Sequence, residues 1–114
     1  MSSAINDVLA ALDAGRSADR LLLKAAVKES LAALVDIAPG HSVEVRIPPF
    51  AAVQAIPGAR HRRGTPPAVV ETDAVTWLLL CAGRTTWQQA RAEGKVHASG
   101  ERSDLSPWLP LSLN

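Results

Sequence analysis

Residues that begin and end helices in the stretch 69–111 are the sequence feature that most constrains the fold. Asp73 stands just before an apolar run and is a typical helix N-cap, because its carboxylate accepts hydrogen bonds from the first free amides. Gly83 ends the run, since glycine adopts at no steric cost the left-handed conformation common just after a helix. These two residues predict one apolar helix between them.

A second helix and a strand follow directly. Thr86 and Gln89 have the spacing of a capping box, which fixes the start of the helix, and Gly94 ends it. Residues 95–98 then alternate between polar and apolar side chains, as a half-buried strand does, and lead into a turn at Ser99-Gly100. The expected order of this segment is therefore helix, helix, strand.

Two amphipathic helices are expected before these elements. The first has apolar residues at helical spacing within 5–12 and a natural end at Gly15, so it either docks on its neighbour or frays. Ser17 is the expected cap of the second, longer helix, which Pro39-Gly40 ends. The apolar stripe of that longer helix consists of Leu23, Val27, Leu31, Leu34 and Val35.

Three short segments in the middle of the chain are typical of strands. Residues 41–47 alternate between apolar and polar side chains, and Pro48-Pro49 ends that strand because proline donates no ladder hydrogen bond. Residues 50–56 and 68–71 are apolar enough for two more strands. We expect one apolar sheet face with Val43, Val45, Ile47 and Val96, and a wet face with Glu44, Arg46 and His97.

Strands set between helices define the expected fold class. A chain of 114 residues, 47% of them apolar, has an ordinary single-domain size and can bury a core. We predict one α+β domain over 1–114, with a small mixed or antiparallel sheet covered by helices on one face. The helix over 17–35 is the expected cover, and the short N-terminal helix within 1–16 is peripheral.

Composition excludes several classes of function. Twelve basic and eleven acidic residues give a net charge of +1, so no global field attracts nucleic acid, and we expect no such partner. Cys81 is the single cysteine, which excludes a disulfide framework and a cysteine-based zinc site. The apolar run 77–82 is too short to cross a bilayer, and the N-terminus does not read as a signal peptide. We expect a cytoplasmic protein.

No arrangement of residues in the sequence predicts catalysis. His41, His61 and His97 are dispersed, without the spacing of metal ligands, and there is no nucleophile elbow or glycine-rich phosphate loop. We therefore expect a protein that is not an enzyme, with no catalytic residues, no metal and no cofactor.

Several of these segments also carry a family likeness: Gly83, Ala90, Gly94-Lys95-Val96, Ser99-Gly100, RIPPF (46–50), RHRRGTPP (60–67) and VVETDAVTW (69–77). Through them the chain resembles the sterol carrier protein type 2 superfamily over 17–111, and most closely its short actinobacterial members. The resemblance implies a small mixed sheet with helices packed on it, enclosing an apolar tunnel for fatty-acyl chains or sterols. Related modules form the C-terminal part of certain acetyltransferases and mycothiol-dependent isomerases, where they are not the catalytic centre.

A ligand groove would lie against the helix that Asp73 begins. Apolar positions on this helix and on the strands would line it, and such a site gains about 25 cal/mol for each Å² of ligand surface taken from water. Any buried helix shows the same spacing, so a filled core is the alternative. The candidate groove residues are Phe50, Val53, Ile56, Trp77, Leu78, Leu80 and Cys81.

The most basic segment is the loop Arg60-His61-Arg62-Arg63. Arginine forks bind carboxylates and phosphates through paired hydrogen bonds, so this loop is a candidate contact for a ligand head group or a protein partner. A solvated loop that contacts neither is the alternative.

The sequence favours two functions, and a third, an enzyme or the accessory subunit of one, stays open because similar modules form parts of enzymes. The first is non-enzymatic binding of a hydrophobic ligand, meaning a fatty acyl chain, a sterol or a related lipid, in the apolar groove. The alternative is a protein-interaction or accessory module that has the sterol-carrier fold but no functional lipid tunnel.

Overall fold

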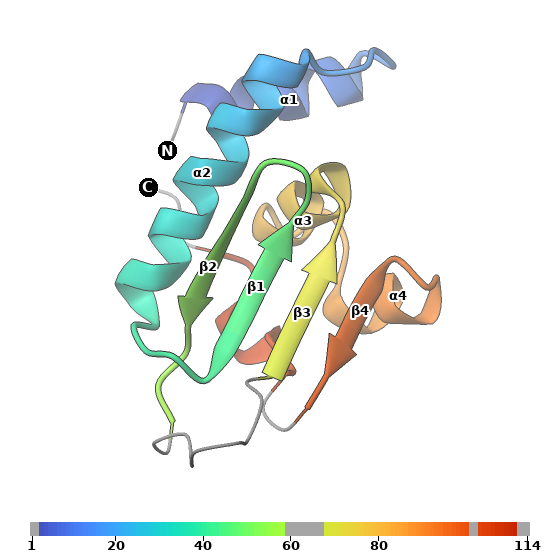
Figure 1. Ribbon diagram of the computed structural model, residues 1–114. Coiled ribbons are helices and arrows are strands. Elements are labelled where there is room, and N and C mark those ends of the chain that lie inside the picture. Colours follow the sequence, from blue (N-terminus) through green and yellow to red (C-terminus); the bar gives the residue numbers. More distant parts are fainter. Residues whose placement is uncertain (1–2, 59–67, 101–102, 112–114) are drawn as a thin grey trace.

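The computed structural model describes residues 3–58, 68–100 and 103–111. These residues form a layer of helices packed on a mixed four-stranded sheet (Figure 1), so the predicted α+β class is confirmed. The helices are α1 (Ser3–Asp13), α2 (Arg20–Ile37), α3 (Ala74–Cys81) and α4 (Trp87–Ala92); the strands are β1 (Val43–Ile47), β2 (Ala51–Ala55), β3 (Ala68–Thr72) and β4 (Val96–Ser99); and a short 3-10 helix, η1, spans Ser106–Trp108.

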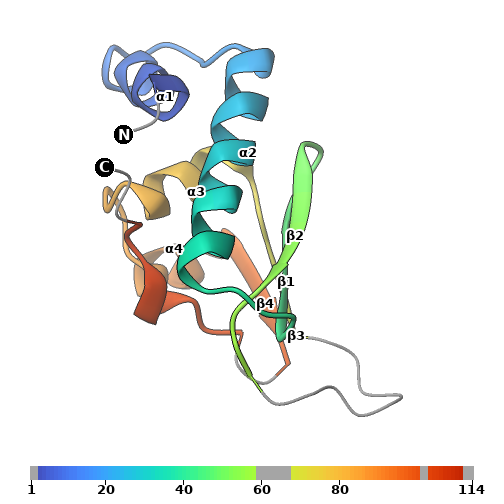
Figure 2. The ribbon, with the colours of Figure 1, turned by 90° about the vertical axis from the view of Figure 1, so that its left-hand side faces the viewer.

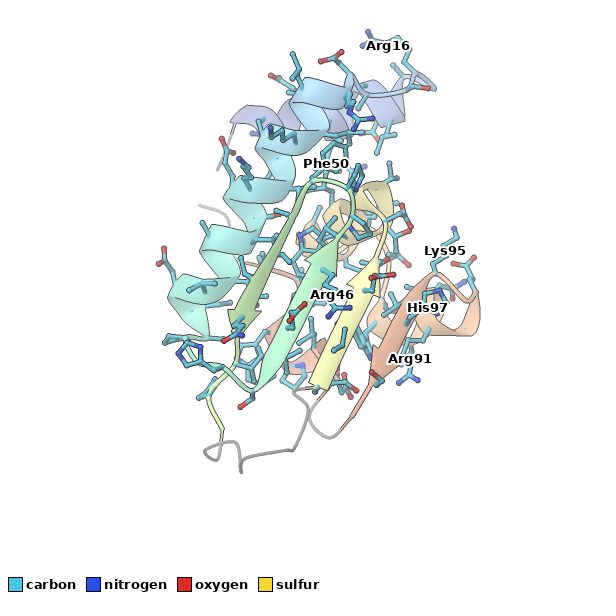
Figure 3. All side chains as sticks on the ribbon, viewed as in Figure 1. Arg16, Arg46, Phe50, Arg91, Lys95 and His97 are labelled. Atoms are coloured by element: carbon cyan, nitrogen blue, oxygen red, sulfur yellow. The ribbon has the colours of Figure 1, made fainter. Side chains whose placement is uncertain are left out.

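The strands lie in the order β2-β1-β3-β4. The central pair, β1 and β3, is parallel, whereas each outer strand pairs antiparallel with its neighbour. The register places Arg46, Glu71 and His97 in one row across the sheet, and Figure 3 shows Arg46 and His97 on the side that no helix covers. The buried face carries Val43, Val45, Ile47, Ala55, Ala68, Val70 and Val96, which confirms the predicted alternation.

All of the helices lie on one side of the sheet, as the view in Figure 2 shows. α2 runs along β2 and α3, and its buried residues Val27, Leu31 and Leu34 belong to the predicted stripe. α1 packs chiefly on α2, so the alternative in which the N-terminal helix docks on its neighbour is the one observed. The core is therefore one apolar layer between the buried sheet face and the helices.

The predicted helix ends at Gly83 and Gly94 are confirmed. Their φ angles are +75° and +72°, in the left-handed region. The amide of Gly83 donates to the carbonyl of Leu80 at 3.2 Å, and the amide of Arg84 donates to that of Leu79 at 2.9 Å. These paired bonds form a Schellman motif, and α4 ends with the same pair.

The predicted helix caps are confirmed at Asp73 and Thr86 but are wrong at Ser17. Asp73 and Thr86 each accept a hydrogen bond of 3.0 Å from the amide three residues further on. α2 begins at Arg20, and its N-cap is Asp19, whose carboxylate accepts the amide of Leu21 at 3.1 Å. A carboxylate at this position also interacts favourably with the positive end of the helix dipole, which a serine hydroxyl does not.

Replacing Asp19 with alanine is expected to lower the free energy of unfolding by about 1 kcal/mol, because the amides it caps lose their acceptor. Ser17→Ala is the matched control and should change stability by less than about 0.5 kcal/mol. Urea denaturation followed by circular dichroism measures both values. A larger loss for Ser17→Ala than for Asp19→Ala would contradict the assignment of Asp19 as the cap.

Candidate ligand-binding site

The four groove candidates on α3 lie in the centre of the protein. Trp77, Leu78 and Cys81 are completely buried, and Leu80 is 1% exposed. α3 carries apolar residues on nearly all sides because it lies between α2 and the C-terminal segment. In this structure the four side chains therefore fill a core.

The three candidates from the second strand and its ends lie around the same layer. Ile56 is 1% exposed, while Phe50 and Val53 are partly buried and pack against the core. The guanidinium of Arg20, at the start of α2, lies 5.7 Å from the centre of the Phe50 ring. All seven predicted residues thus belong to, or pack against, one apolar cluster, and the four on α3 are at most 1% exposed.

A buried hydrogen-bond chain links α2 to α3 inside this cluster. The indole Nε1 of Trp77 donates to Ser30 Oγ at 2.8 Å, and Ser30 Oγ donates to the carbonyl of Val27, also at 2.8 Å. Ser30 is fully buried. Ser30 is not among the predicted site residues because it is polar, although it lies three residues from Val27 and four from Leu34, on the buried face of α2.

Cys81 lies in the same environment, where burial raises the pKa of its thiol. The protein contains no tyrosine, so this thiol dominates the response of folding to mildly alkaline pH. Above the unfolded pKa of about 8.5, the unfolded chain loses the thiol proton while the folded chain keeps it. The free energy of unfolding should therefore fall by up to about 1.4 kcal/mol per pH unit as pH rises from there.

The pH dependence of Cys81 is measured by urea denaturation between roughly pH 8 and pH 10, around the unfolded thiol pKa. Cys81→Ala is the control, and its stability should change less over the same range because the titrating group is gone. A wild-type slope no steeper than that of Cys81→Ala would contradict the burial of this thiol.

A segment close to the C-terminus covers the end of α3. The amide of Leu111 donates to the carbonyl of Cys81 at 3.0 Å, and Pro110 lies against Gly83. Leu105 is completely buried and Leu111 nearly so. The sequence does not predict this role, because the prolines and short apolar groups of the segment lack a regular period.

Two open depressions border the end of α3. One, of about 480 Å³, has Thr76 and Leu79 of α3 at its edge together with Arg84. The other, of about 340 Å³, is lined by Leu80, Trp87 and Pro110 among others. Both volumes fall within the range of small-molecule sites, and their walls combine apolar with polar surface.

Arg84 forms the only long-range ion pair among the described residues, since the other two lie within a strand and beside a helix end. Its Nη1 lies 2.7 Å from Asp13 Oδ1 at the end of α1. The hydrogen bond from Arg84 lowers the pKa of the Asp13 carboxyl. This pair joins two segments separated by 71 positions.

The two remaining histidines in the described part of the chain lie apart from the apolar cluster. Residues 60–63 lie outside the described residues. His97 is exposed on the bare sheet face (Figure 3), and His41 lies 2.7 Å from Gln54 Oε1. In residues 3–58, 68–100 and 103–111, no three histidine, cysteine or acidic side chains are arranged to hold a metal ion, and no helix is long and apolar enough to cross a membrane.

A mixed sheet with helices on one face, enclosing one continuous apolar layer, defines a domain of the sterol-carrier-like class. The family model described as bacterial SCP ortholog, where SCP denotes sterol carrier protein, matches residues 19–111. The chain belongs to this family, which confirms the resemblance seen in the sequence. No curated protein matches the chain.

Proposed function

We propose that this protein binds an apolar ligand, a fatty acyl chain, a sterol or a related lipid, in the cytoplasm and catalyses no reaction on it. The observation that carries the proposal is membership of the sterol carrier family over 19–111. Supporting it is the composition of the helical layer, in which the contacts between α2, α3 and the sheet are almost entirely apolar.

Ligand binding of this kind requires a change in packing. The side chains of Trp77, Leu78 and Cys81 are completely buried, so an acyl chain enters only if another group moves out. Contacts between apolar side chains are non-directional, and an acyl chain can replace them without leaving hydrogen bonds unmade. The hydrogen bond between Trp77 and Ser30 fixes α3 to α2. Any movement that admits a ligand must therefore come from the other elements of the helical layer.

Extraction of the purified protein with organic solvent, followed by mass spectrometry, tests this function. We expect a lipid to co-purify in an amount comparable with the protein and to be depleted after delipidation on a hydrophobic resin. A mock purification from cells without the protein is the control. Recovery of no lipid above the mock level, together with no uptake of added fatty acid or sterol, would contradict the proposal.

The alternative is an interaction module with this fold and no lipid site. The filled core around Trp77 favours it, because a permanently packed layer needs no ligand. In that case, added fatty acid should leave the thermal midpoint of the delipidated protein unchanged. A ligand that binds the folded state must raise that midpoint, and the rise grows with the logarithm of the ligand concentration once this exceeds the Kd, which separates the two functions.

A further inference from the structure

We propose that the ligand site lies beneath α1, and that Arg84 binds the carboxylate of a fatty acid there in place of Asp13. The inference rests on the proposed function and deepens it, since it names the ligand class, the residue that holds the head group and the segment that moves. In this structure α1 occupies the site itself.

α1 presents the same two chemical groups as a fatty acid, a carboxylate and an aliphatic surface. At one end it carries the Asp13 carboxylate, which is bound to Arg84 at 2.7 Å. Away from that end runs an aliphatic stripe, in which Ile5 and Val8 are completely buried and Leu9 is 7% exposed. Ile5 and Asp13 are eight residues apart, or about 12 Å along the helix. A fatty acid likewise has a carboxylate at one end and an apolar chain that can extend over a similar length.

α1 is a short helix with little intrinsic stability of its own. It has 11 residues, and isolated helices of this length are marginal in water. No acidic residue stands in its first turn and no basic residue in its last, so the helix dipole has no complementary charge at either end. The Asp13 carboxylate at its C-terminal end is unfavourable for the dipole, and Arg84 compensates for it.

The way α1 is attached allows it to move as a unit. Its packing partner is α2, and an exposed connection around Gly15 and Arg16 joins the two helices. In Figures 1 and 2, α1 lies at one end of the helical layer, above α3 and on the same side of the sheet. The family match begins at residue 19, so α1 precedes the part of the chain that the family shares.

Arg84 is placed to receive a carboxylate once α1 has moved. Its backbone is fixed by the Schellman motif that ends α3, where its amide donates to Leu79 at 2.9 Å. Its side chain is 46% exposed and borders the 480 Å³ depression. A carboxylate at the surface and a chain beneath it match a fatty acid better than a sterol, whose polar group is a hydroxyl with no charge to pair with Arg84.

Paired ligands test the role of Arg84. The fluorescent probes are cis-parinaric acid and its methyl ester, which share one chain and differ in the carboxylate. With Arg84→Gln we expect the Kd of the acid to rise about tenfold, because a charge-assisted hydrogen bond is lost. The Kd of the ester should not rise and should fall by up to about threefold, because Arg84→Gln also breaks the ion pair that holds α1 over the site. With Asp13→Asn the acid should bind about threefold more tightly, because its competitor for Arg84 is gone.

Arg46→Gln is the matched control. Arg46 is an exposed arginine paired with a carboxylate, Glu44, but it lies on the bare face of the sheet, away from α1 (Figure 3). This variant should bind both probes as the wild type does. If Arg84→Gln weakens acid and ester equally, its effect is structural, and the proposed head-group role is wrong.

Hydrogen–deuterium exchange of the full chain tests the movement of α1. Saturating oleate should increase exchange at least tenfold for the amides of α1 and should decrease it for α3. Val8→Asp, which removes a buried anchor of α1, should strengthen binding of the ester, whereas Asn6→Asp on the exposed face should not.

The outcomes separate this inference from the proposed function. Binding of both probes without any dependence on Arg84, Asp13 or α1 would overturn the inference and leave lipid binding intact. Binding of neither probe by the wild type, Asp13→Asn or Val8→Asp would overturn both.

Discussion

Replacing Gly40 with alanine is expected to lower the free energy of unfolding by about 4 kcal/mol, which corresponds to a drop of roughly 15 °C in the thermal midpoint. A Cβ atom on Gly40 would lie 2.2 Å from the carbonyl oxygen of Ile56 and 2.8 Å from the Cα of Pro57. Both neighbours are backbone atoms, so no side chain can move aside.

The surroundings of Gly40 offer little relief. Its φ of +152° strains any other residue, and Ile56 has a φ of +76°, which is rare for a β-branched side chain. The amide of Ile56 donates to Ala38 at 2.7 Å, and its carbonyl accepts the amide of Ser42 at 3.2 Å. These bonds hold the end of β2 against the turn after α2, which fixes the position of the atom that a Cβ would meet.

Gly94→Ala is a control that separates the cost of a positive φ from the cost of a steric clash with the added Cβ. Gly94 has a φ of +72°, but a Cβ there meets nothing within 4 Å. This variant should lose about 1 kcal/mol, the difference between alanine and glycine in the left-handed conformation. Chemical denaturation of both proteins measures the two losses. Equal losses would contradict the close approach of Ile56 to Gly40.

Trp77→Ala is expected to lower the free energy of unfolding by about 3–5 kcal/mol, as is typical when a large aromatic side chain is removed from a packed core. Trp77 is completely buried, and its indole donates to Ser30. The variant loses the apolar contacts and leaves a cavity. Trp108→Ala, at a partly exposed position of η1, is the control and should lose clearly less.

Trp77→Phe covers the case in which the alanine variant does not fold. Phenylalanine keeps most of the packing but removes the donor, and a double-mutant cycle with Ser30→Ala should give a coupling free energy of about 1 kcal/mol. If Trp77→Ala costs no more than Trp108→Ala, the helical layer contains an open cavity around Trp77 rather than a packed core.

Local signals predicted most of the fold because each depends on a few neighbouring residues. Gly83 and Gly94 end helices through backbone conformation alone, and the alternation of 43–47 follows from the pleat of one strand. The cap of α2 was misplaced by two residues, since Ser17 and Asp19 both have side chains that cap helices and the sequence does not say which amides come first.

The candidate site was predictable only in part, because periodicity reports which side chains are buried but not what buries them. Trp77 and Leu78 were identified as facing an apolar space, and the structure fills that space with other side chains. The Arg84–Asp13 pair joins positions 71 apart and depends on how α1 packs. Nothing in the neighbourhood of either residue indicates the other.

Titration of the delipidated wild-type protein with cis-parinaric acid, with excitation of tryptophan and detection of probe emission, tests most directly whether this sterol-carrier fold takes up an acyl chain. Trp77 lies inside the apolar layer, so a bound chain must come within energy-transfer range. We predict a signal that saturates at one probe per chain and is reversed by unlabelled oleate. A signal that rises linearly without saturation, and that oleate does not displace, would contradict lipid binding.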